Sequence, residues 1–142
     1  MTILVDTSVW SLALRRRDLS EDPAVLELRE LIQESRAHLI GAIRQEVLSG
    51  IREKAQFEKL RDRLRGFPDL PVRTVDHERA AEFLNLCRSR GVQGSNTDFL
   101  LCAVADRYGL EILTTDEDFP LYARHLPVRL HAPRGFSGLD RR

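Results

Sequence analysis

Four acidic residues, spread along the chain, together indicate a site for a divalent metal ion. They are Asp6, Glu46, Asp98 and Asp116. Two like charges about 4 Å apart repel each other by about 4 kcal/mol at an effective dielectric constant of ~20. A bound cation would remove this cost, and carboxylate oxygens are the ligands that Mg²⁺ and Mn²⁺ prefer. The chemistry that such a site serves is phosphodiester hydrolysis.

Each acid taken singly also has a simpler interpretation. Asp98 lies three residues after Ser95, a spacing typical of a capping box at the start of a helix. Asp6 could cap a helix in the same way, and Glu46 could belong to a surface ion pair. Asp116 could be an ordinary turn residue. The metal site therefore depends on whether the fold brings the acids together.

The elements that would carry these acids alternate between short apolar strands and helices. The expected strands are 2–5, 38–40, 72–75, 111–114 and 128–131. The expected helices follow Asp6 and then span 23–35, 42–50, 54–65, 76–90, 95–108 and 119–125. No tight hairpin signal separates the strands. This order predicts an α/β fold of three layers, with a central parallel sheet of about five short strands and helices on both faces.

The parallel sheet would place the acids at one edge. Asp6 and Asp116 come after two of the expected strands, and the carboxyl ends of parallel strands share an edge where ligands bind. Glu46 lies beside the apolar stripe of its helix, and Asp98 lies in the first turn of its own. We expect all four to converge at that edge.

Composition sets the class of protein. The 142 residues fit one domain, which we expect over residues 1–132, followed by a short tail over 133–142. Equal numbers of basic and acidic residues, 22 each, leave no overall field that would indicate a nucleic-acid-binding protein. No apolar run is long enough for a membrane span, and no signal pattern opens the chain, so we expect a cytoplasmic protein. Cys87 and Cys102 lack zinc-site spacing and are expected to be reduced packing residues.

Four segments of the chain resemble the PIN-domain nucleases and, within them, the VapC-type toxins of bacterial and archaeal toxin–antitoxin pairs. The segments are ILVDTSVW at 3–10, RQEVLSG at 44–50, SNTDFLLCAVA at 95–105 and LTTDEDF at 113–119. Each is weak alone, but all four in this order make a specific signal. The resemblance implies that the catalytic and metal-binding acids are Asp6, Glu46, Asp98 and Asp116. It also implies auxiliary positions at Thr7, Ser8, Thr114 and Asp118.

The resemblance further implies a Mg²⁺- or Mn²⁺-dependent endoribonuclease that cleaves tRNA, ribosomal RNA or another RNA to arrest translation. Members usually form homodimers, and a small cognate antitoxin blocks them. One or two ions, held by Asp6 and Asp98 and flanked by Glu46 and Asp116, would activate a water and leave a 5′ phosphate. Ser8 or Thr114 would orient a carboxylate or a water, although plain capping is an equal alternative for both hydroxyls.

Other side chains have less specific interpretations. Arg15, Arg16 and Arg17, with the bases of segment 52–65, could hold an RNA backbone, but the acids that alternate with the bases of that segment favour a solvated face. Trp10 and Leu14 are expected in the core or at a dimer surface. The four histidines have no evident triad partners, so we expect each to be structural or exposed.

Three other functions are weighed against the toxin. A phosphoacceptor receiver domain would need paired acids after its first strand and a late lysine, but Asp6 stands alone and no lysine follows Lys59. An RNA-processing or quality-control nuclease without an antitoxin stays open. A non-catalytic PIN-like module that binds RNA or protein also stays open, although the complete set of acids argues against it.

Overall fold

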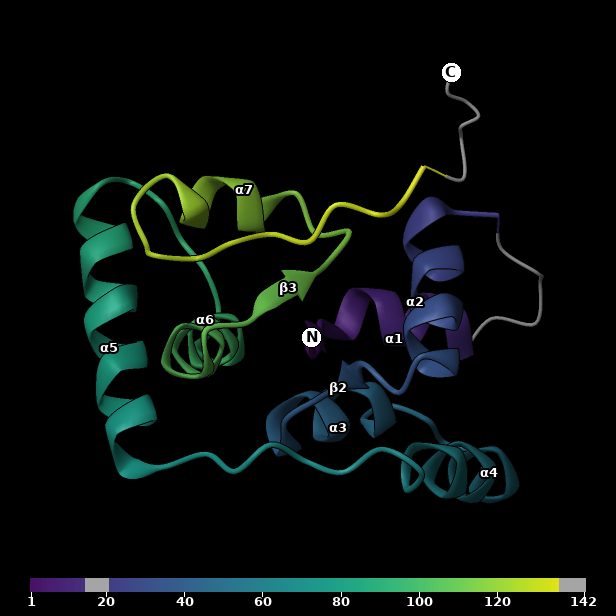
Figure 1. Ribbon diagram of the computed structural model, residues 1–142. Coiled ribbons are helices and arrows are strands. Elements are labelled where there is room, and N and C mark those ends of the chain that lie inside the picture. Colours follow the sequence, from purple (N-terminus) through teal and green to yellow (C-terminus); the bar gives the residue numbers. More distant parts are fainter. Residues whose placement is uncertain (15–20, 136–142) are drawn as a thin grey trace.

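The computed structural model describes residues 1–14 and 21–135. These residues form seven helices and a parallel sheet of three strands in the order β2–β1–β3 (Figure 1). The strands are β1 (Ile3–Val5), β2 (Ala37–His38) and β3 (Glu111–Leu113). Ile3 pairs with Ala37 on one side and Glu111 on the other, and Val5 pairs with Leu113. The α/β class and the parallel sheet are thus confirmed.

The helices begin and end largely where their capping residues predict. Asp22 caps α2 by accepting a hydrogen bond from Ala24 N, and Pro23 occupies the first turn. Gly109 ends α6 in the left-handed conformation, with φ of 69°. The helices are α1 (Thr7–Leu14), α2 (Pro23–Gln33), α3 (Gly41–Leu48), α4 (Lys54–Leu64), α5 (Thr74–Ser89), α6 (Asn96–Tyr108) and α7 (Asp118–Ala123).

The two outer strands differ from the prediction. Residues 72–75 are not a strand, because Arg73 N donates to Asp76 Oδ2 at 2.8 Å and α5 already begins at Thr74. Single bridges replace the outer strands, Leu39 with Asp69 at one edge and Ile112 with Leu130 at the other. Prolines at 68, 71 and 127 lie close to these bridges. Proline has no N–H to donate, which limits the length of an edge strand.

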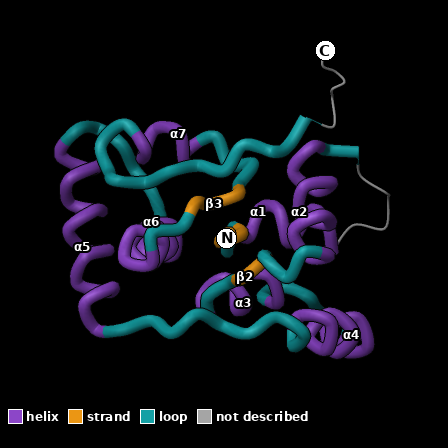
Figure 2. Tube along the Cα trace, viewed as in Figure 1, coloured by secondary structure: helices purple, strands orange, loops and turns teal. Residues whose placement is uncertain are grey.

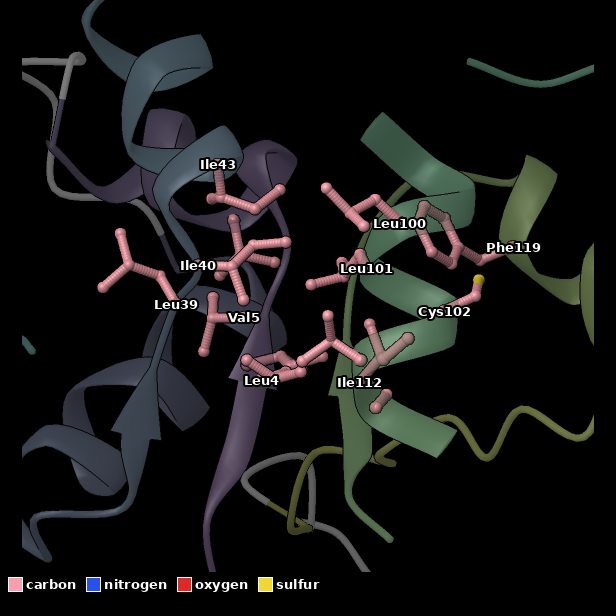
Figure 3. Close-up of a cluster of buried hydrophobic side chains, with 14 of the residues drawn as sticks. Leu4, Val5, Leu39, Ile40, Ile43, Leu100, Leu101, Cys102, Ile112 and Phe119 are labelled. Carbon is pink, nitrogen blue, oxygen red and sulfur yellow. The ribbon is translucent and has the colours of Figure 1, made fainter. Parts of the chain in front are cut away.

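Helices cover both faces of the sheet, with α5 and α6 on one side and α1 and α2 on the other (Figures 1 and 2). All three residues of β1 are fully buried, as expected for a strand covered on both faces. Leu4, Leu101 and Ile112 meet between the sheet and α6 (Figure 3). The core therefore fixes the starts of α1 and α6 relative to the ends of β1 and β3.

The packing predictions for the two cysteines and for Trp10 are confirmed. Cys87 and Cys102 are buried and free, and Trp10 is buried, with its Nε1 donating to Val5 O at 3.1 Å. No helix in 1–14 or 21–135 is long and apolar enough to span a membrane. The expected tail starts at residue 133. Within it, Arg134 forms ion pairs with Glu27 on α2 and with Glu34, the C-cap residue of the same helix.

Candidate active site

Asp6 lies between the end of β1 and the start of α1, and its side chain is almost entirely buried. Its Oδ2 atom accepts hydrogen bonds from Ser8 Oγ at 2.9 Å and from Thr114 Oγ1 at 2.8 Å. Asp6 N donates to Leu113 O, which extends the pairing of β1 with β3 up to the acid. Burial raises the pKa of Asp6, and the hydrogen bonds from Thr114 and Ser8 oppose that rise.

Asp98 lies in the first turn of α6, as predicted. Its backbone N–H donates to Ser95 Oγ at 3.1 Å, and its Oδ2 atom accepts a hydrogen bond from Tyr122 Oη at 2.7 Å. Burial raises the pKa of Asp98 to about 6. The hydrogen bond from Tyr122 opposes this rise, whereas the negative charges of Asp6 and Asp116 add to it. Asp6, Asp98 and Asp116 are therefore close enough to interact through their charges.

Asp116 occupies the loop between β3 and α7 in a tight turn. Its backbone N–H donates to Thr114 Oγ1 at 3.0 Å, and its Oδ1 atom accepts from Asp118 N at 2.9 Å. Thr114 therefore contacts Asp6 through its hydroxyl hydrogen and Asp116 through its oxygen. This hydroxyl joins two of the acids that the sequence placed at strand ends.

Glu46 lies on α3 and contacts the first turn of α1. Its Oε1 atom accepts a hydrogen bond from Thr7 Oγ1 at 2.6 Å. Arg44, two residues before Glu46 on α3, pairs with Asp69 at 2.9 Å and not with Glu46. Thr7 and Ser8, adjacent in the first turn of α1, thus hold Glu46 and Asp6 respectively.

Two of the acids lie at the starts of helices, and each also has a long-range partner. Asp6 O accepts hydrogen bonds from Val9 N and Trp10 N at the start of α1, and Ser95 caps α6 next to Asp98. In both cases the carboxylate also accepts a side-chain hydroxyl from a distant element, from Thr114 or Tyr122. A position at the start of a helix therefore leaves each carboxylate able to accept a hydrogen bond from a distant part of the chain.

The donor set fits a hard divalent cation by its chemistry. In the described residues, no ion pair joins Asp6, Glu46, Asp98 or Asp116 to a basic side chain. Among the same residues, no group of three or more acidic, histidine or cysteine side chains is close enough to hold a metal ion. Asp6, Asp98 and Asp116 thus interact through their charges, but they do not form a closed coordination shell. Such uncompensated oxygens are the ligands that Mg²⁺ or Mn²⁺ takes.

Other predictions fall outside this neighbourhood. Arg15, Arg16 and Arg17 lie outside the described residues. On α4, Arg61 and Arg65 pair with Asp62, which agrees with a solvated face. His131 is structural, since it lies between Glu27 and Glu111.

Sequence reasoning missed Tyr122. Phe119 and Tyr122 are three residues apart on α7, and that spacing predicts a shared buried face. It does not predict that the phenol hydroxyl meets Asp98, which is 24 residues earlier in the chain.

The chain matches known proteins over most of its length. Residues 3–125 match the PIN domain family. A curated relative, Ribonuclease VapC11 of Mycobacterium tuberculosis, is 32% identical over 126 residues, covering 86% of this chain and 92% of the relative. VapC ribonuclease Mb1587 of Mycobacterium bovis matches with the same identity and coverage.

Solved structures share the fold. FitAcB from Neisseria gonorrhoeae superposes with a TM-score of 0.71 at 20% identity, covering 93% of this chain and 98% of that one. VapBC-5 of Mycobacterium tuberculosis, a member of the VapBC family of toxin–antitoxin systems, gives 0.66 at 19% identity, covering 91% and 96%. The strand-end acids, the fold and the match over residues 3–125 agree, and this chain belongs to the PIN domain family, with VapC ribonucleases among its relatives.

Proposed function

We propose that this protein is a Mg²⁺- or Mn²⁺-dependent endoribonuclease and the toxin of a toxin–antitoxin pair. The observation that carries the proposal is that Thr114 contacts both Asp6 and Asp116, while no ion pair among the described residues joins either acid to a base. The negative charges of these two acids also raise the pKa of Asp98. The names of the curated relatives, which are ribonucleases, support the same reaction class. The catalytic domain would span residues 1–132, with 133–142 as a tail.

The residues of the site would act by holding carboxylates in place. Asp6 and Asp98 would hold one or two ions, with Glu46 and Asp116 beside them. A bound ion would supply Lewis acidity and lower the pKa of a bound water. Ser8 and Thr114 orient Asp6, and Thr7 orients Glu46, through the hydrogen bonds given above. Asp118 would be auxiliary, because its backbone N–H fixes the Asp116 carboxylate.

The partners follow from the same proposal. The solved neighbours include toxin–antitoxin complexes, so we expect a small antitoxin that inhibits this protein. We also expect a homodimer and an RNA substrate, with Arg15, Arg16 and Arg17 contacting the RNA backbone. A ribonuclease that arrests translation would act in the cytoplasm, where its RNA targets are.

The proposal is tested by RNA cleavage with purified variants. We expect Asp6→Asn and Asp98→Asn to stay folded and to lose at least about 10²-fold in rate, the scale on which removal of one charge stabiliser acts. Chelation by EDTA should abolish wild-type cleavage, and Mg²⁺ or Mn²⁺ should restore it. Asp106→Asn is the matched control, because Asp106 lies on the same helix as Asp98 and pairs with Arg79.

Cleavage at the wild-type rate by both Asn variants would contradict the proposal. An RNA-binding module without activity would bind RNA and leave it intact under every condition. Co-expression with the product of a short neighbouring reading frame would test the antitoxin, since a cognate partner should suppress cleavage and growth arrest together. A quality-control nuclease would show cleavage without such suppression.

A further inference from the structure

The Tyr122 side chain connects α7 to the Asp98 carboxylate. Tyr122 is fully buried, and its Oη atom donates a hydrogen bond to Asp98 Oδ2 at 2.7 Å. The last torsion of an aspartate side chain is broad, so a carboxylate without a partner samples many orientations. A hydrogen bond to one oxygen from a fixed donor selects the plane of the group. Tyr122 thus determines where the other oxygen of Asp98 points.

Two aromatic rings hold the phenol in place. The ring centroids of Phe99 and Tyr122 are 4.8 Å apart, and those of Phe119 and Tyr122 are 5.1 Å apart with an edge-on angle of 67°. Phe99 follows Asp98 on α6, and Phe119 lies on α7, so the rings join the two elements. Buried aromatic contacts of this kind keep side chains in single rotamers. The donor to Asp98 is therefore rigid.

Gly94 forms the wall on another side of the phenol. A Cβ atom at this position would lie 2.3 Å from Tyr122 Oη, 2.7 Å from Tyr122 Cζ and 2.9 Å from Phe99 Cε2. No real Cβ atom makes contacts this short, so any larger residue at position 94 must displace the ring. Glycine is required here for space. The backbone at Gly94 thus lies directly against the phenol that contacts Asp98.

We propose that Tyr122 is a positioning residue that orients the Asp98 carboxylate for a divalent cation, and that Gly94 keeps its hydroxyl in reach. This inference rests on the proposed function, because it assigns Asp98 to a metal. It goes beyond that function by adding two residues that the acidic motifs do not contain. Groups that hydrogen-bond metal ligands typically change metal affinity or activity by about 10–100-fold when they are mutated.

The test is Tyr122→Phe, which removes only the hydroxyl. We expect the Mn²⁺ dissociation constant, measured from the electron paramagnetic resonance signal of free Mn²⁺, to rise by about 10-fold. At limiting Mn²⁺, kcat for RNA cleavage should fall by a similar factor, while KM for RNA should not change. Saturating Mn²⁺ should recover most of kcat. A merely structural tyrosine would not give this dependence on metal concentration.

Tyr108→Phe is the matched control. Tyr108 Oη donates to Pro71 O, and Tyr108 lies ten residues after Asp98 on the same helix, which is about 15 Å along its axis. We expect wild-type Mn²⁺ affinity and cleavage from this variant. Equal Mn²⁺ affinity in Tyr122→Phe and the wild type would overturn the inference and leave the proposed function intact.

A second variant, Gly94→Ala, retains the Tyr122 phenol but should displace it. Gly94→Ala should reproduce the weaker Mn²⁺ binding, whereas Gly41→Ala should not, because a Cβ at Gly41 meets nothing within 4 Å. Should Tyr122→Phe fail to fold, Gly94→Ala decides the question in the same way. If the variants bind Mn²⁺ more weakly but the wild type never cleaves RNA, the positioning role is supported and the nuclease proposal is contradicted. A wild-type protein that binds no Mn²⁺ overturns both.

Discussion

The molecule buries carboxylates in two regions and surrounds them differently. At the acidic site, Asp6 and Asp98 accept hydrogen bonds from hydroxyl groups. On α2, Glu27 is fully buried against bases, with its Oε2 2.5 Å from His131 Nε2 and its Oε1 3.0 Å from Arg134 Nε. The two regions lie at opposite ends of β3, since Glu111, which contacts His131, opens the strand and Thr114 follows it.

The partners decide the sign of the pKa shift. Burial raises the pKa of Glu27, but hydrogen bonds from His131 and Arg134 outweigh burial and the pKa is lowered. At Asp98 burial dominates, the charges of Asp6 and Asp116 add to it, and the pKa rises to about 6. Burial alone therefore does not distinguish a structural acid from a functional one. A buried acid that is supplied with bases is stabilised within the fold, whereas one without them is available to a cation.

We expect Glu27→Gln to change the free energy of unfolding more than any other variant that tests this comparison. Removing one partner from a buried pair costs about 3–5 kcal/mol. We expect about 3 kcal/mol at pH 7, at the low end, because the Arg134 side chain is 44% exposed. Because the pKa of Glu27 is lowered in the folded state, its contribution is present above its unfolded pKa and is lost as the pH falls. Urea unfolding followed by circular dichroism measures the difference.

Glu30→Gln, on the same helix, is the control and should change the free energy of unfolding by less than about 0.5 kcal/mol. RNA cleavage per folded molecule should be unchanged in both variants, because the Glu27 cluster lies at the other end of β3. A Glu27→Gln protein as stable as the wild type would show that the bases do not stabilise this region.

Asp98→Asn should act in the opposite direction and stabilise the protein. The pKa of about 6 in the folded state exceeds the ordinary aspartate value of 3.8, so the folded state binds more protons between these two pH values. The stability of the wild type therefore falls as the pH rises through this window. Asp98→Asn has no ionisable group at this position, so its stability does not fall in the same way. With EDTA present we expect a gain of about 2 kcal/mol above pH 6.5, after allowance for solvent screening, and almost none near pH 4.

Urea unfolding of both proteins across pH 4–8 gives this profile. In the wild type, Asp106 pairs with Arg79 on the surface. Asp106→Asn should therefore show no such gain in stability above pH 6. An Asp98→Asn protein less stable than the wild type at pH 7.5 would contradict the view that the acidic site is electrostatically unfavourable without a cation.

The sequence predicted the positions of Asp6 and Asp116 because parallel topology forces strand ends to a common edge. It also predicted the start of α6, where Ser95 supplies the local cap. These features depend on neighbours in the chain or on the order of elements. The catalytic roles of Asp6 and Asp116 stay predictions until RNA cleavage is measured.

What the sequence could not predict depends on long-range contacts. Residues 72–75 contain two β-branched valines, yet the bond from Arg73 N to Asp76 Oδ2 begins a helix there. The Asp76 side chain is then held by Arg107, 31 residues later in the chain. The contact of His131 with Glu27 joins residues 104 positions apart. No periodicity within α2 or α7 indicates such partners, because the pattern identifies a buried face and not the group that meets it.

The smallest effect should come from Ser8→Ala, which tests whether hydroxyls replace bases at the acidic site. Ser8 Oγ donates to Asp6 Oδ2 and accepts from Thr115 N at 3.1 Å, so the variant loses two hydrogen bonds. Thr114 still donates to Asp6. We expect a loss of about 1 kcal/mol in urea unfolding, the usual scale of one net hydrogen bond, and a fall of about 10-fold in RNA cleavage.

Ser89→Ala is the control for Ser8→Ala, because the Ser89 hydroxyl donates to Leu86 O on the exposed surface of α5. It should leave cleavage unchanged. The ratio of the two effects is what matters: Ser8→Ala should disturb activity more than stability, and Glu27→Gln should do the reverse. If Ser8→Ala destabilises the protein as much as Glu27→Gln, the hydroxyls stabilise buried acids as strongly as bases do. The Asp6 neighbourhood would then be as structural as the Glu27 cluster, and its unbalanced charge would no longer indicate a metal.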